Sequence, residues 1–263
     1  MELAFTDAGS GTPVVLLHGQ PGNAGDWGPV MDRLQGKVRV IAPDRPGYGR
    51  TAGRAVGFRE NARAVAALLD RLEVESAVVA GHSWATGVAL AAAAEFRERV
   101  RALVLAAPVA PGVSPSRVDR ALAHPLLGPA AARVGFRVTG WAIAAAPVRR
   151  VARGAVPELT PSQIAASAQQ WRRDGVWKSF YVEQRALIAE LPALRPSLES
   201  IETPTLILQG TRDWITPPAH ARRLAEVLPD SELVTVDHAG HMLPQQRPDL
   251  MADAILSAAV PRR

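Results

Sequence analysis

Short apolar runs alternate along this chain with longer segments whose apolar positions recur at helical spacing. The apolar runs, rich in β-branched residues, predict strands near residues 2–6, 14–17, 37–42, 76–81, 100–106, 204–210 and 232–236. The longer segments predict helices near residues 24–35, 58–72, 84–96, 218–228 and 247–259. This alternation favours an α/β fold, with a mostly parallel sheet flanked by helices on both faces.

The alternation stops between about residues 110 and 200. No buried-strand run occurs there, and helical pieces are predicted near residues 116–123, 128–146, 161–173 and 176–191. Thr160-Pro161-Ser162-Gln163 is typical of a helix start, with Thr as the N-cap and Gln at the capping-box position. A helical insertion between the two halves of a sheet predicts a lid over the strand ends. We therefore divide the chain into a core, 1–109 and 201–263, and a lid, 110–200.

Composition narrows the function classes. The net charge is +5, but Lys37 and Lys178 are the only lysines and the arginines are scattered, so no nucleic-acid surface is expected. No apolar run reaches the roughly 18 residues of a membrane span. The absence of cysteine excludes disulfides and thiolate metal sites. Because the N-terminus has neither a basic start nor a long apolar segment, we expect no signal peptide and a cytoplasmic protein.

The strongest chemical signal is Gly81-His82-Ser83-Trp84-Ala85, which joins a predicted strand to a helix of small residues. A serine at such a sharp turn presents its hydroxyl clear of the sheet. The free N–H groups of the helix start face the same point, where they can stabilise an oxyanion. Ser83 is therefore the candidate nucleophile.

Two further residues complete a catalytic constellation. Asp213 follows the strand predicted at 204–210, and His241 lies in the loop after the strand at 232–236. The chain order Ser, Asp, His is typical of a triad on a parallel sheet. His238 is the competing base, and Asp237 is the first other acid to consider.

The residue types fit nucleophilic catalysis. A serine hydroxyl needs a base, and imidazole, with an unperturbed pKa of about 6.5, is suited to neutral pH. The base needs a carboxylate to fix its tautomer and stabilise the imidazolium. The oxyanion hole is predicted to use the backbone N–H groups of Trp84, after the nucleophile, and Gln20, in the loop after the strand at 14–17.

The chain resembles the α/β-hydrolase superfamily, in the neighbourhood of esterases, haloperoxidase-like enzymes and C–C hydrolases. The resemblance spans nearly the whole chain and is carried by His18-Gly19-Gln20-Pro21-Gly22, Asp44-Arg45-Pro46-Gly47-Tyr48-Gly49, Gly81-His82-Ser83-Trp84-Ala85, Gly210-Thr211-Arg212-Asp213 and Ala239-Gly240-His241. It implies an α/β-hydrolase fold with a helical lid inserted in the second half. Ala85 departs from the family's glycine, and we expect only slight crowding from its methyl group.

The resemblance implies a carboxylesterase-like serine hydrolase that cleaves an ester or related carbonyl bond of a small to medium, fairly hydrophobic substrate. The same triad serves C–C bond hydrolases of ring-cleavage products, acyltransferases, perhydrolases, proline-iminopeptidase-like aminopeptidases and non-catalytic ligand receptors. A serine at position 83 argues against epoxide hydrolases and haloalkane dehalogenases, which use a carboxylate there. No metal or cofactor is expected, and a homo-oligomer is left open.

Aromatic residues of the lid suggest an apolar substrate pocket. Trp141, Trp171 and Trp177 are the candidates, and the last two flank a break at Gly175. Each ring alone is more typical of packing than of ligand contact, and only as a group do they indicate a pocket. An aminopeptidase would also need lid carboxylates for the substrate amine, and the candidates are Glu158, Glu183 and Glu190.

Overall fold

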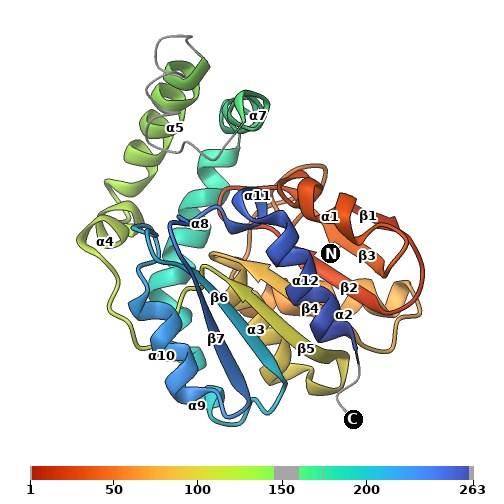
Figure 1. Ribbon diagram of the computed structural model, residues 1–263. Coiled ribbons are helices and arrows are strands. Elements are labelled where there is room, and N and C mark those ends of the chain that lie inside the picture. Colours follow the sequence, from red (N-terminus) through yellow and green to blue (C-terminus); the bar gives the residue numbers. More distant parts are fainter. Residues whose placement is uncertain (1, 145–159, 174, 261–263) are drawn as a thin grey trace.

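A seven-stranded sheet forms the centre of the molecule in the computed structural model, which describes residues 2–144, 160–173 and 175–260 (Figure 1). The strand order is β1-β3-β2-β4-β5-β6-β7. The strands are β1 (Phe5–Ala8), β2 (Pro13–Leu17), β3 (Arg39–Pro43), β4 (Ala77–His82), β5 (Val100–Ala106), β6 (Thr205–Gly210) and β7 (Ser231–Val236). All seven predicted strands are present, and the predicted fold class is confirmed.

The sheet is parallel except at one edge. β1 pairs antiparallel with β3, with Phe5 opposite Pro43, and every other pairing is parallel. β1 begins later than the predicted 2–6. Leu3 lies before the strand and packs into the hydrophobic core. The apolar pattern at residues 2–4 therefore reflects this packing and not a strand.

Helices cover both faces of the sheet and create two cores. Alternate residues of β2 divide between them, because successive side chains of a strand point to opposite faces: Val15 and Leu17 enter one core, and Val14 and Leu16 the other. The first core packs against α2 (Phe58–Arg71), α3 (Ala85–Glu95) and α10 (Ala219–Val227). The second packs against η1 (Ala24–Trp27), α1 (Gly28–Leu34), α11 (Leu243–Gln246) and α12 (Pro248–Ala259).

The secondary-structure elements described in the insertion (residues 110–200) are all helices. The insertion contains α4 (Arg117–Ala123), α5 (Gly128–Ala144), α7 (Pro161–Trp171), α8 (Val176–Ala189), η3 (Leu191–Leu194) and α9 (Arg195–Leu198). Thr160 caps α7 in the predicted capping box with Gln163, and Gly175, at φ +101°, separates α7 from α8. Figure 1 shows α5 and α7 standing clear of the sheet while α8 returns toward it. The end of the helix predicted at 128–146 lies outside the described residues, and the lid function stays a prediction.

The described helices also bear on membrane insertion. In the ranges that the structure covers, none is both long enough and apolar enough to cross a bilayer.

Candidate active site

Ser83 occupies the sharp turn between β4 and α3. Its backbone φ is +54°, a left-handed conformation that costs a non-glycine residue about 1–3 kcal/mol and persists only where the surroundings enforce it. The Ser83 N–H donates to the carbonyl of Ala106 on β5 (2.9 Å), and the Thr86 hydroxyl donates to the Ser83 carbonyl (2.6 Å). These bonds hold the turn in the conformation that presents the Ser83 hydroxyl.

The turn tolerates alanine where the family has glycine. Ala85 is fully buried at the start of α3. Gly81 is also tightly placed, because a Cβ there would come within 2.9 Å of the Ala85 carbonyl oxygen. Glycine is therefore required at position 81, and the slight crowding expected from the Ala85 methyl group stays a prediction.

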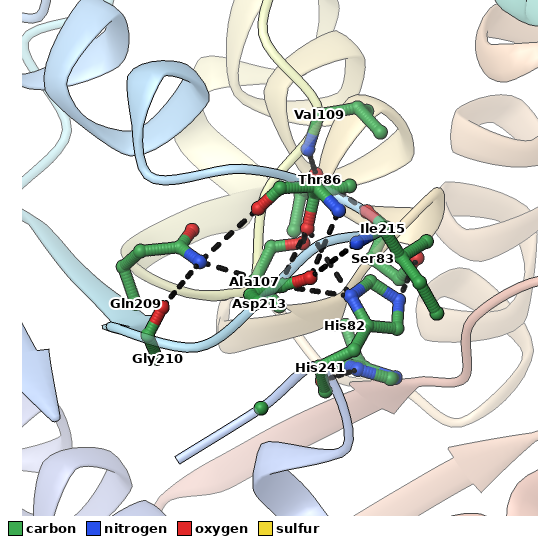
Figure 2. Close-up of polar contacts among 12 residues, drawn as sticks. His82, Ser83, Thr86, Ala107, Val109, Gln209, Gly210, Asp213, Ile215 and His241 are labelled. Carbon is green, nitrogen blue, oxygen red and sulfur yellow. Dashed lines mark hydrogen bonds and ion pairs between the residues drawn. The ribbon is translucent and has the colours of Figure 1, made fainter. Parts of the chain in front are cut away.

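The structure brings the three predicted triad side chains together (Figure 2). The Ser83 hydroxyl lies 2.8 Å from His241 Nε2, and His241 Nδ1 lies 2.9 Å from Asp213 Oδ2. In this arrangement Nδ1–H donates to the carboxylate and Nε2 accepts from the serine. Figure 2 shows the three side chains converging from the ends of β4, β6 and β7.

Asp213 is held as a carboxylate by donors on both oxygens. Oδ1 accepts from the N–H groups of Ile215 and Thr216, both at 2.9 Å. Oδ2 accepts from His241 Nδ1, lies 3.2 Å from Gln209 Nε2, and is 2.8 Å from the Thr216 hydroxyl. Burial raises the pKa of Asp213, but the hydrogen bonds from His241 and Thr216 outweigh it and lower the pKa below its usual range.

His82 supports the loop that carries the base. Its Nε2–H donates to the His241 carbonyl (2.8 Å), and the two rings lie 5.1 Å apart. Burial, assisted by the neighbouring His241, lowers the pKa of His82 to about 3. His82 is therefore neutral, and its effect on the site is to fix the backbone of His241.

Asp237 and His238, the competing candidates, have no hydrogen bond to the Ser83 hydroxyl among the described contacts, in which His241 is its partner. Asp237 and His238 are both exposed. His238 has a left-handed backbone, with φ at +60°, and its N–H donates to the Thr211 hydroxyl (3.1 Å). Geometry thus favours His241 as the base and Asp213 as its partner.

Sequence reasoning missed the two residues that brace the acid, Thr216 and Gln209. The Thr216 hydroxyl contacts both the Asp213 carboxylate (2.8 Å) and the Ala107 carbonyl (3.0 Å). It therefore links the acid to the residue that follows β5. A threonine three residues after an aspartate is a recognisable local pattern for a side-chain-capped turn. Gln209 lies within an apolar strand, and nothing in the local pattern marks its role.

The loop after β2 lies against the nucleophile, as the oxyanion-hole prediction requires. A Cβ on Gly19 would be 3.1 Å from the Ser83 Cβ, a tight contact that favours glycine at this close approach. Gln20 follows in the loop, and Trp84 directly precedes α3. Among the described residues, neither the Gln20 nor the Trp84 backbone N–H has a hydrogen-bond partner. Their role as oxyanion donors stays a prediction.

The three candidate pocket tryptophans gather at one cavity of about 740 Å³ between α5, α7 and α8. Trp141 is exposed, whereas Trp171 is half-buried and edge-on to Phe136. The cavity is lined by Arg133, Phe136, Arg137, Trp141, Trp171, Arg172, Arg173, Gly175, Trp177 and Lys178. No triad residue lines it, so it is distinct from the site at Ser83. The assignment of these rings to the substrate pocket stays a prediction.

The side chains of the described residues also bear on metal binding. In the described ranges, no group of three His, Asp or Glu side chains is placed to hold an ion.

Comparison with known proteins identifies the family and shows how varied its reactions are. A model of the alpha/beta hydrolase fold matches residues 12–248. 2-Hydroxy-6-oxo-2,4-heptadienoate hydrolase of Pseudomonas putida is 30% identical over 254 residues, covering 92% of this chain and 86% of that protein. Haloalkane dehalogenase 2 of Mycobacterium tuberculosis is 27% identical over 259 residues, covering 96% and 89%. The structure of a thermophilic esterase from Thermogutta terrifontis has a TM-score of 0.78 at 27% identity, covering 97% and 92%.

Proposed function

Because the chain belongs to the alpha/beta hydrolase fold family, we propose that it is a serine hydrolase of the carboxylesterase type. Its substrate would be a small to medium, fairly hydrophobic ester or related carbonyl compound. The observation that carries the proposal is the continuous chain of hydrogen bonds from Ser83 through His241 to Asp213, at 2.8 and 2.9 Å. Acyl transfer requires a nucleophile hydrogen-bonded to a base and a base hydrogen-bonded to an acid, and both hydrogen bonds are present.

In the first half of the reaction, His241 Nε2 takes the proton of the Ser83 hydroxyl as the oxygen attacks the substrate carbonyl. The negative charge that develops on the carbonyl oxygen is stabilised by the Gln20 and Trp84 N–H groups. The Asp213 carboxylate stabilises the imidazolium that forms. His241 then gives its proton to the departing alcohol, which leaves an acyl group on Ser83.

In the second half, water replaces the alcohol. His241 Nε2 takes a proton from the water as its oxygen attacks the acyl carbon, and the same N–H groups stabilise the second oxyanion. The proton returns to Ser83 as the carboxylic acid departs. Because backbone donors and the triad supply both activation and charge stabilisation, the proposed cycle uses no cofactor.

C–C bond hydrolysis is the second candidate, because the relative with 30% identity is named as the hydrolase of a dienoate. Dehalogenation is less consistent with the site, since a serine and not a carboxylate stands at the nucleophile position. Aminopeptidase activity is less well supported, because two of the three carboxylates proposed to bind the substrate amine already have partners. Glu183 pairs with Arg45, and Glu190 accepts a hydrogen bond from the Phe58 N–H. The third, Glu158, lies outside the described residues.

A fluorophosphonate probe tests the proposal, because it reacts covalently with an activated serine. We expect labelling of the wild-type chain at Ser83, hydrolysis of p-nitrophenyl esters, and loss of both in Ser83→Ala, with turnover reduced by about 10⁴- to 10⁶-fold. His241→Ala should be about as inactive, whereas His238→Ala is the matched control and should retain most activity. A screen of acyl-chain lengths and vinylogous diketones separates ester from C–C hydrolysis. Near-normal turnover by Ser83→Ala would refute the proposal.

A further inference from the structure

A fully buried ion pair joins the core to the insertion. Arg45, in the loop after β3, is 1% exposed, and Glu183, on α8, is 0% exposed. Arg45 Nη1 donates to Glu183 Oε1, and the Tyr48 hydroxyl donates to Oε2 (2.8 Å). Removing two charges from water costs several kcal/mol per ion, so a buried pair is weak evidence for a stabilising role. The other contacts of Arg45 and of α8 indicate the role of this ion pair.

Arg45 also binds the loop that carries Gln20. Its Nε–H donates to the His18 carbonyl (2.8 Å), and Nη2–H donates to the Gly19 carbonyl (3.0 Å). The Arg45 backbone N–H donates to His18 Nε2 (2.9 Å), so the ring is anchored as well. The guanidinium thus fixes the two peptide carbonyls directly before Gln20, while Glu183 fixes the guanidinium.

The same helix contacts both predicted oxyanion donors through their side chains. Gln20 Nε2 donates to the Phe180 carbonyl of α8 (2.8 Å). Trp84 Nε1 donates to the Glu183 carbonyl of α8 (3.1 Å), and its ring lies 4.7 Å from the Arg45 guanidinium carbon. Gln20 comes from the loop after β2 and Trp84 from the turn before α3, and α8 binds both.

We infer that Arg45 and Glu183 are positioning residues that set the geometry of the oxyanion hole, and that α8 is a structural part of the catalytic apparatus. This inference rests on the proposed serine hydrolase function. Oxyanion donors act only within about 2.7–3.1 Å of the developing charge, and a misplacement of about 1 Å can cost about 10²-fold in rate. Arg45 and Glu183 act through the loop and not on the substrate.

Glu183→Gln tests the inference with a minimal change, since it keeps the shape of the side chain and removes the charge that orients the guanidinium. We expect kcat for a p-nitrophenyl ester to fall by about 10- to 100-fold while KM changes by less than about 3-fold, on the scale of one weakened oxyanion donor. Gln20→Met removes the bond to Phe180 without leaving a buried charge, and it should lower kcat in the same way. The matched control is Glu190→Gln, directly after α8, whose carboxylate accepts from the Phe58 N–H (3.0 Å) and does not touch the loop. It should leave kcat unchanged.

Inhibitor affinity separates positioning from mere folding. A trifluoromethyl ketone adds to Ser83 and forms an oxyanion, whereas the corresponding alcohol binds without one. We expect Glu183→Gln and Gln20→Met to lower the affinity for the ketone by the same factor as they lower kcat. The affinity for the alcohol should not change. A lower thermal midpoint with unchanged kcat and ketone affinity would overturn the inference. If the wild-type chain were neither labelled by the fluorophosphonate nor active, the proposed function itself would fail, and the inference with it.

Discussion

Gly210→Ala should disable the triad without touching any of its side chains. Gly210 ends β6, and its Cα faces the backbone of the loop that carries His241. A Cβ added there would lie 2.5 Å from the Gly240 carbonyl oxygen and closer still to that of Ala239. Both neighbours are backbone atoms, so no side chain can rotate to make room.

The size of the effect follows from this geometry. Real Cβ atoms essentially never approach other atoms within 3.0 Å, so the loop must move by at least about 0.6 Å, the gap between 3.0 Å and the 2.4 Å approach to the Ala239 carbonyl oxygen. His241 directly follows Gly240, whereas Asp213 is anchored separately by Ile215 and Thr216. The movement therefore falls on the 2.9 Å bond between His241 and Asp213. Because about 1 Å of misplacement can cost about 10²-fold, we expect kcat to fall by about 10- to 100-fold.

The assay compares kcat and thermal midpoint for wild type, Gly210→Ala and Gly28→Ala. Gly28 begins α1, and a Cβ there would meet nothing within 4 Å. This control should keep full activity and gain stability by up to about 1 kcal/mol, since alanine favours a helix over glycine. A folded Gly210→Ala protein with wild-type kcat would show that the loop absorbs the methyl group elsewhere, and the argument from close approach would be refuted.

Two further changes address the titratable groups. Asp213→Asn should keep the fold and lower kcat by about 10⁴-fold through a misoriented imidazole; an unchanged rate would redirect attention to Asp237. Burial raises the pKa of Asp26 from 3.8 to about 6. The folded chain therefore holds this proton more tightly than the unfolded chain, and the resulting stability is lost as pH rises through about 6. Relative to Asp26→Asn, wild type should lose about 2 kcal/mol of unfolding free energy between pH 4.5 and 7.5 in urea titrations; parallel curves for the two proteins would contradict this.

The sequence predicts the elements that depend on local pattern. Apolar runs identify β2, β3, β4, β5 and β6 because buried parallel strands are apolar on both faces. Ser83, Asp213 and His241 can be predicted because each lies in the turn or loop after a strand, and parallel strands end at one edge of a sheet. The antiparallel direction of β1 is set by its long-range pairing with β3, which no local pattern encodes.

Local sequence patterns do not predict the contacts between the insertion and the core. Arg45 and Glu183 are 138 residues apart, and their pairing depends on how α8 is rotated against the loop after β3. The polar face of a helical pattern normally indicates solvent, so Glu183 has no local sign of complete burial. The tryptophans illustrate the same limit: aromatic content predicts that a cavity exists, but helix packing decides where it lies.

The insertion leaves and re-enters the sheet between two neighbouring strands. β5 ends at Ala106, β6 begins at Thr205, and Leu103 pairs with Thr205 in parallel register. The cost of closing a loop grows only with the logarithm of its length, by about 0.6 kcal/mol for each doubling. Evolution can therefore lengthen, shorten or replace α4, α5 and α7 with little effect on the stability of the sheet. The hydrogen bonds of α8 with Gln20, Arg45 and Trp84 exempt that helix from this freedom. Descendants of this chain would diversify in substrate range by changing the outer helices, while α8 would be inherited with the triad.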